Sequence, residues 1–322
     1  MRVAVIGVGA IAKVLLPAII ESECTIEGVM SRSGDSARRV ARRYGIPRVY
    51  GSLQDIDTDA AFVLTGTESH ARVALPLLER GIPVFLEKPM AMTLRDAERL
   101  TATADRKGVL LMVGFNRRYA PVYEALKSAW RHDIPDVIIA EKNRPDIDYR
   151  GTLDNAIHIV DMMRWICGEA IEVTASSQYS DPYHETSCVA HLRFAHSIGV
   201  MVANRSCGQW AEHIETYGAG KTVRVEAPES FAVIERNQTR TTSLLPASDG
   251  LVTPQTRLGF RQEVEDFLRV IQSGGEVRSP ARDAMETHRL MHRILQAAGL
   301  PDMNDERPAA NSSVSGGSGQ RS

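Results

Sequence analysis

A lysine, an aspartate and a histidine in this sequence have the types and spacing needed to handle a proton at a reacting oxygen. Lys88 lies between Glu87 and Pro89 in the segment FLEKP, directly after an apolar run. Its ammonium group could donate a hydrogen bond to a substrate oxygen and stabilise charge that develops there. The alternative is a surface lysine paired with Glu87, which the dipeptide alone would favour.

Asp154 and His158 stand four residues apart in LDNAIHIVD, a spacing that places both on one face of a helix. A carboxylate beside an imidazole changes the pKa of that imidazole, and histidine is the usual side chain for proton transfer near neutral pH. The alternative is an ion pair on a helix surface.

A glycine-rich turn follows the first apolar segment, RVAVI, and has the form G-x-G-x-x-A. The first glycine permits a tight turn, the second lets the backbone approach a pyrophosphate, and the small last residue lets helix and strand pack closely. The N–H groups at the start of the next helix would bind phosphate oxygens. The motif predicts a dinucleotide site, with a plain tight turn as the alternative; the candidate contacts are Gly7, Gly9, Ala10, Ile11 and Ala12.

The end of the second expected strand bears on the choice of dinucleotide. NAD sites usually carry an acid there to bind the ribose 2′-hydroxyl, whereas this chain has Ser31, Arg32 and Ser33. A hydroxyl and a guanidinium suit a 2′-phosphate, so we expect NADP(H) over NAD(H). The alternative is that Arg32 is a solvated loop charge.

The elements that would position these residues alternate between strand and helix over residues 1–120. Apolar runs such as RVAVIGV, AAFVLTG and VLLMVGFN are separated by helical segments of ten or more residues. This pattern predicts a doubly wound parallel sheet with helices on both faces, a Rossmann domain of the α/β class. Ligands lie beyond the carboxyl ends of such strands, so Lys88 would point into the cofactor crevice.

The pattern changes over residues 121–303, where strand-like runs separated by turns predict an α+β domain with a large, mostly antiparallel open sheet. Two helical segments then follow, each ended by glycine, and could pack back on the first domain. Residues 304–322 are nearly devoid of apolar side chains, which is typical of a disordered tail.

Composition excludes several classes of function. The chain has 322 residues with 38 basic and 40 acidic side chains and a net charge of −2, which argues against nucleic acid or an anionic membrane as partner. It contains no apolar run long enough to span a membrane and no signal-peptide pattern, so we expect a cytoplasmic protein. The four cysteines are scattered, which predicts reduced, mostly buried thiols.

Three further signals are weak. YGAGKT lacks the first glycine of a phosphate-binding loop and lies among strands, so a hairpin turn is expected. His288 and His292 are four residues apart but have too few acidic neighbours for a metal site, and no metal is expected. Arg117 and Arg118 could contact a phosphate, although such pairs are usually solvated.

Several of these segments together resemble the glucose-fructose oxidoreductase and inositol dehydrogenase (Gfo/Idh/MocA) family of NAD(P)-dependent oxidoreductases, over nearly the whole chain to about residue 300. The segments are GVGAIA, TGTESH at 65–70, EKP at 87–89, GFNRRY at 114–119, and Asp154 with His158. The stretch EKNRPDIDYRGTLDNAIHIVD is further similar to the MviM-like branch. Gly66 and Thr67 depart from the family, which often has proline and asparagine there.

The resemblance implies a dehydrogenase or reductase acting on a CH–OH group of a sugar, nucleotide sugar or cyclitol. It implies that Lys88, Asp154 and His158 form the catalytic group, and that the open sheet forms a homodimer or homotetramer. The cofactor contacts that it implies are Thr65, Thr67, His70, Glu87, Lys88 and Asn116. Lys142, Arg144 and Asn155 are candidates for substrate contacts, with a structural ion pair as the alternative for Lys142 and Arg144.

Two other functions remain open from the sequence. The same cofactor could serve a redox-neutral reaction such as glycoside cleavage through transient oxidation. The chain could also be a non-catalytic regulator that senses NAD(P), although the presence of both Lys88 and His158 argues against it.

Overall fold

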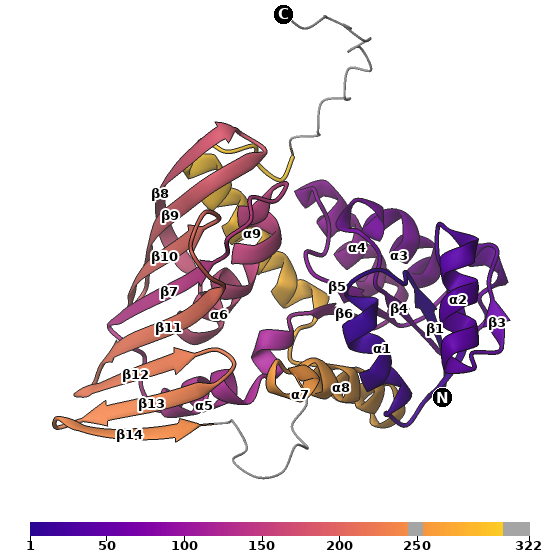
Figure 1. The fold of residues 1–322 in the computed structure, drawn as a ribbon, viewed down its shortest axis with the longest axis horizontal. Helices are drawn as coiled ribbons and strands as arrows, with labels where there is room; N and C mark the ends of the chain where they lie inside the picture. The colour runs from indigo at the N-terminus through magenta and orange to yellow at the C-terminus, as the bar shows by residue number, and fades with distance from the viewer. Residues whose placement is uncertain (244–253, 305–322) are drawn as a thin grey trace, which may run out of the picture.

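The computed structural model describes residues 1–243 and 254–304, which form two sheets joined by helices (Figure 1). The first sheet has six parallel strands. In sheet order they are β3 (Arg48–Val49), β2 (Thr25–Met30), β1 (Arg2–Ile6), β4 (Ala60–Val63), β5 (Val84–Glu87) and β6 (Leu111–Gly114). The predicted doubly wound parallel sheet is confirmed, and its strand order changes direction beside β1, where such folds bind ligands.

Helices cover both faces of this sheet. One face packs against α1 (Ala12–Ile20), α2 (Gly34–Tyr44) and α8 (Phe260–Ser273), and the other against α3 (His70–Glu79) and α4 (Leu94–Lys107). Helix α8 comes from the far end of the chain. Its Phe267 ring lies 5.3 Å from the ring of Phe62 and 5.8 Å from that of Phe85, so a C-terminal residue completes the N-terminal core.

The second sheet has eight strands and is mostly antiparallel, as predicted. Within the described strands of this second sheet, only β7 and β10 pair in parallel. In sheet order the strands are β14 (Gln238–Ser243), β13 (Ser230–Glu235), β12 (Lys221–Glu226), β11 (Ala211–Gly218), β7 (Val137–Asn143), β10 (Ile198–Asn204), β9 (His184–Phe194) and β8 (Ala170–Asp181). YGAGKT forms the expected hairpin, with Gly218 opposite Lys221.

One face of the second sheet is covered and the other is bare in the described part of the chain. Figure 1 shows α5 (Pro121–Ala129), α6 (Ile157–Cys167) and α9 (Ala281–Ala297) on the face toward the first domain. Side chains alternate accordingly along the strands: Leu192 of β9 is buried, whereas Val189 on the opposite face is exposed.

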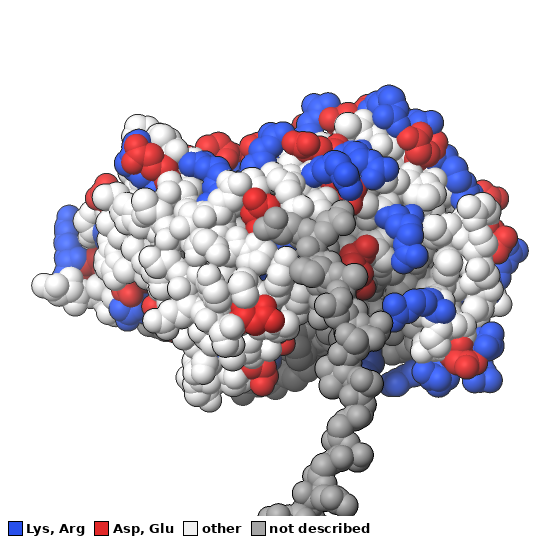
Figure 2. All heavy atoms as spheres, turned by 90° about the horizontal axis from the view of Figure 1, so that it is seen from above, with Lys and Arg blue, Asp and Glu red and all other residues white. Residues whose placement is uncertain are grey.

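The charged side chains on the surface are mixed in sign. Figure 2 shows Lys and Arg interspersed with Asp and Glu along the upper rim of one face, in keeping with a net charge of −2. No helix among residues 1–243 and 254–304 is long and apolar enough to cross a membrane. All four cysteines are free thiols, and two of them, Cys167 and Cys188, are buried. Apart from Asn304, the predicted tail lies outside the described residues.

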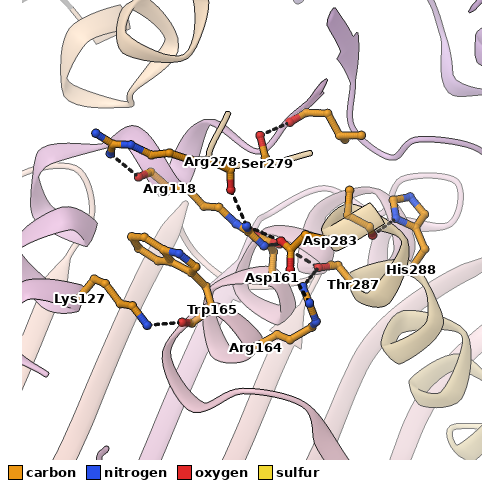
Figure 3. A network of polar contacts seen from close by, with 12 residues as sticks. Arg118, Lys127, Asp161, Arg164, Trp165, Arg278, Ser279, Asp283, Thr287 and His288 are labelled. Carbon is orange, nitrogen blue, oxygen red and sulfur yellow. Dashed lines mark hydrogen bonds and ion pairs between the residues drawn. The ribbon is translucent and has the colours of Figure 1, made fainter. Parts of the chain in front are cut away.

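The interpretation of Arg117 and Arg118 as solvated side chains is wrong, because both are buried in ion pairs. The Arg118 guanidinium donates two hydrogen bonds, of 2.8 and 2.6 Å, to the Asp161 carboxylate (Figure 3). Asp161 also accepts from the Thr287 hydroxyl at 2.8 Å. A buried charge is tolerated only when it is paired, so this network joins α6 to α9 and to the turn η3 (Asn116–Tyr119).

Candidate active site

The glycine-rich turn between β1 and α1 has the geometry of a phosphate cradle. Gly7 has φ +99°, and a Cβ added there would lie 2.5 Å from the Leu64 carbonyl oxygen, so only glycine fits. At Gly9 a Cβ would meet no atom within 4 Å, which leaves the backbone open to a ligand. Ala12 is buried where α1 begins, and no side chain caps that helix. These features fit the pyrophosphate of a dinucleotide.

The residues expected to select the dinucleotide follow β2. Ser33 caps α2 and accepts a hydrogen bond of 3.4 Å from the Ser36 backbone N–H. Arg32 is exposed beside it, where its guanidinium is free to approach a 2′-phosphate.

His70 connects two loops at the carboxyl edge of the first sheet. Its Nδ1 lies 2.8 Å from the Pro89 carbonyl oxygen, and its Nε2 lies 3.1 Å from the Thr65 carbonyl oxygen. Burial lowers the pKa of His70, and a neutral ring donates to only one of these carbonyls. His70 therefore positions the loops after β4 and β5 from beneath, while Thr65 and Thr67 remain partly exposed above it.

Lys88 follows β5 and points toward the second domain rather than lying on the surface. Its Nζ donates to the Asp154 carbonyl oxygen at 2.8 Å and to the Asp154 carboxylate at 3.2 Å. The side chain of Lys88 is only 14% exposed. Glu87 is buried behind it and accepts the Lys88 backbone N–H at 3.0 Å, so the carboxylate is paired with backbone, not with the Lys88 amine.

Asp154 and His158 are not on one regular helix. Asp154 lies in a π-helical turn, η4 (Thr152–Ala156), and His158 lies in the first turn of α6. The wider π turn changes the angle between the two positions. In the described structure Asp154 accepts from Lys88, and no hydrogen bond joins Asp154 to the imidazole of His158.

The environment of His158 keeps its imidazole neutral. The side chain is buried, and its pKa is well below the usual value, first because of burial and then because of the charges of Arg117, Lys142, Lys88 and Arg144. Its Nδ1 has no hydrogen-bond partner among the described residues. A neutral imidazole with a free nitrogen is able to accept a proton.

Lys142 belongs to an ion-pair network beneath His158, which favours the structural alternative for this residue. It is fully buried and bonded to Glu212, which also accepts two hydrogen bonds of 2.8 Å from Arg117. Burial and then Arg117 lower the pKa of Lys142 to about 7. Because Arg117 alone balances the charge of Glu212, Lys142 can lose its proton near neutral pH while Glu212 stays ionised.

The remaining candidates divide by exposure. Asn116 is buried and its amide donates to the Leu258 carbonyl at 2.8 Å, a contact that holds the start of α8. Asn155 is buried within η4, and Arg144 is partly exposed just after β7. Two residues that the sequence analysis missed lie nearby: Arg205, after β10, and Glu263, on α8. Their positions depend on strand pairing and helix packing, for which the sequence carries no local signal.

A cavity of about 660 Å³ lies between the loops of the first sheet and η4. Its lining residues are Gly66, Thr67, Glu68, Pro89, Met92, Thr93, Tyr149, Arg150, Leu153 and Asp154. No cluster of three or more potential metal ligands occurs in residues 1–243 and 254–304. The site thus combines a dinucleotide cradle, a lysine, a neutral histidine and a cleft between the two domains.

Comparison with known proteins gives consistent matches along the chain. A family model described as an oxidoreductase family with an NAD-binding Rossmann fold matches residues 1–115, and one described as the GFO/IDH/MocA C-terminal domain matches residues 125–224. The protein YceM of Salmonella typhimurium is 34% identical over 230 residues, which cover 68% of this chain and 74% of that protein.

More distant relatives extend over most of the chain. The myo-inositol 2-dehydrogenase of Thermotoga maritima is 24% identical over 300 residues, or 85% of this chain and 89% of its own length. A crystal structure of an MviM dehydrogenase from Clostridium difficile superposes with a TM-score of 0.85 at 22% identity, covering 92% of this chain and 99% of that one. At this identity the superposition shows the fold.

Proposed function

This chain belongs to the Gfo/Idh/MocA family of oxidoreductases, and from that premise we propose that it transfers a hydride between nicotinamide C4 and a carbon bearing a hydroxyl group. The substrate proposed is a sugar, nucleotide sugar or cyclitol. The observation that carries the proposal is the Lys88 amine bound to Asp154 beside a neutral, buried His158, at the strand ends next to the glycine turn.

The cofactor, when bound, supplies the hydride acceptor or donor. Gly7, Gly9 and the first turn of α1 would bind its pyrophosphate, and Glu87 with Lys88 would hold the nicotinamide ribose. Ser31 and Arg32 favour NADP(H) over NAD(H) in this proposal, because residues 31–33, directly after β2, include no acid to repel a 2′-phosphate.

The proton moves through this chain's own side chains. In the oxidising direction His158 accepts the proton of the substrate hydroxyl, because its imidazole is neutral and its Nδ1 lacks a partner. Lys88 donates a hydrogen bond to the same oxygen and stabilises the charge that grows on it. Asp154 orients Lys88 through the contacts of 2.8 and 3.2 Å. The sequence had suggested a different role for Asp154, that of acting on His158.

The test is a screen of NADPH and NADH fluorescence against sugars, keto-sugars and cyclitols with the wild type, Lys88→Ala and His158→Ala. We expect each substitution to lower kcat/KM about 100-fold or more, as loss of an acid–base group does. Cofactor affinity should be unchanged in His158→Ala and lower in Lys88→Ala, which also loses the contact with the nicotinamide ribose. Lys107→Ala, at the exposed end of α4, is the matched control and should keep full activity.

Other outcomes of this screen contradict the proposal. Product formation without net change in NADPH or NADH would indicate the redox-neutral reaction. Cofactor binding with no turnover in the wild type, and the same biological output from Lys88→Ala, would indicate a sensing regulator.

A further inference from the structure

Two arginines leave the second sheet side by side at its edge near the active site. Strands β7 and β10 are parallel, and their last residues, Asn143 and Asn204, are register partners. Arg144 and Arg205 follow directly, and the Arg144 backbone N–H donates to the Asn204 carbonyl at 2.8 Å. The parallel pairing therefore brings two guanidinium-bearing residues to the same edge of the sheet, although 61 positions separate them in the chain.

The guanidinium of Arg205 is buried with much of its hydrogen-bonding capacity unused. The side chain is 1% exposed, and it packs against Gly151, where an added Cβ would lie 2.8 Å from Nε. Its Nη2 is bonded to Asp148, whereas Nε and Nη1 have no partner among the described residues. Leaving two donors of a buried cation unpaired is costly unless a ligand supplies the acceptors.

Arg144 is less well paired still. Its Nε is buried without a partner, and the described residues form no ion pair with its guanidinium. Burial lowers the pKa of Arg144, and the charges of Arg205 and Arg117 lower it further, while the more weakly acting Asp154 and Glu212 raise it. The charge of Arg144 also acts on His158, which places this arginine beside the proposed base.

The other cations in this part of the site each have a carboxylate partner. Asp148 pairs with Arg205, Asp154 with Lys88, and Glu212 with Arg117 and Lys142. Arg144 has no such counterion in the described structure. An oxyanion on the substrate would supply the missing negative charge and the missing acceptors together.

Building on the dehydrogenase function proposed above, we infer that the substrate is a polyhydroxylated molecule with a carboxylate or phosphate group that Arg144 and Arg205 bind. The planar guanidinium fork matches both oxyanions and donates two parallel hydrogen bonds to them. Since Arg205 packs on Gly151, at the start of the turn that bears Asp154, the bound oxyanion would direct a neighbouring hydroxyl toward Lys88 and His158.

Calorimetric titration of the protein saturated with NADPH tests this inference, with malonate and inorganic phosphate as separate probes. The cofactor occupies its own phosphate site, so the probes report the second one. We expect saturable binding that weakens about tenfold or more in Arg144→Gln and Arg205→Gln, with Arg205→Lys intermediate because it keeps the charge but not the fork. Arg131→Gln, an exposed arginine with the same change in charge, is the control.

The two probes distinguish a carboxylate from a phosphate ligand. Absence of saturable binding of both, or equal binding by wild type and Arg144→Gln, would overturn the inference. Thermal melting shows whether Arg205→Gln folds. If it does not fold, Arg144→Gln still tests the inference, because Arg144 is partly exposed.

Turnover separates this inference from the proposed function. KM is measured for galacturonate against galactose and for glucose 6-phosphate against glucose. In the wild type, the KM of an acidic substrate should be lower than that of its neutral counterpart by about tenfold or more. The arginine variants should lose this difference. Equal KM values for the acidic and the neutral member of each pair in the wild type would refute the oxyanion site and keep the dehydrogenase. Oxyanion binding without any hydride transfer would support the oxyanion site and refute the dehydrogenase function.

Discussion

At the residue scale, the two glycines of the cofactor turn have the same type but different reasons to be there. Gly7 is required by the fold, since its backbone is left-handed and the Leu64 carbonyl fills the space of a side chain. Gly9 has open space at its Cα, so its small size serves an approaching ligand. The sequence motif contains both glycines but does not separate these roles.

A matched pair of substitutions tests this difference. We expect Gly9→Ala to keep the melting temperature of the wild type while the Kd for NADPH rises about tenfold or more, because a methyl group occupies the space of the pyrophosphate. Gly7→Ala should lower both the melting temperature and the affinity. Thermal melting and fluorescence titration measure the two effects, and unchanged cofactor affinity in Gly9→Ala would place the pyrophosphate elsewhere.

At the scale of elements, α8 brings a second buried carboxyl group to the end of β5. Neither oxygen of Glu263 has a hydrogen-bond partner among the described residues. Burial, and then the charge of Glu87, raise the pKa of Glu263 well above its usual value. Burial likewise raises the pKa of Glu87 to about 7. The folded protein therefore holds protons that the unfolded chain releases.

From the raised pKa values of Glu87 and Glu263 we predict a specific dependence of the stability of the fold on pH. Because both folded-state pKa values are raised, the stabilising contribution is fully present below the unfolded pKa of about 4.5 and is lost as pH rises through the folded-state pKa, which for Glu87 is about 7. Glu263→Gln cannot ionise, so its melting temperature should fall less over that window than that of the wild type. Scanning calorimetry between about pH 5 and pH 8 measures this, with the exposed Glu265→Gln on the same helix as control. A parallel pH dependence in wild type and Glu263→Gln would contradict the prediction.

At the scale of the whole molecule, the bare face of the second sheet exposes several apolar side chains. Val189 of β9 and Ile198 of β10 are 43% and 48% exposed on neighbouring strands, and Ile171, at a bulge in β8, is 51% exposed beside them. Exposed apolar groups gathered on one surface mark an interface. We propose that two copies pair through this face, as homodimers or as pairs within a homotetramer.

One charge on this face should separate the copies. We expect Val189→Glu to lower the mass measured by light scattering to that of the monomer, because burying an unpaired carboxylate at an interface costs more than the contact contributes. Val49→Glu, at a site 38% exposed on the edge of the first sheet, makes the same change away from the interface and should leave the mass unaltered. A wild type that is already monomeric would contradict the proposal.

The local patterns of the sequence determined much of the architecture. Alternating strands and helices, the glycine turn and the lysine after β5 depend on interactions within a few residues, so they can be read from the order of residues. The same reasoning placed Asp154 and His158 in one segment, but it predicted a regular helix where the structure has a π turn.

Only the tertiary structure decided which of these groups meet. Arg205 reaches Arg144 through the pairing of β10 with β7, Glu263 reaches Glu87 through α8, and Arg117 finds Glu212 in the interior. Each contact joins residues far apart in the chain, and burial then sets whether a charge is paired, neutral or left for a ligand. Local spacing contains no information on that desolvation, because it depends on which surfaces the folded chain removes from water.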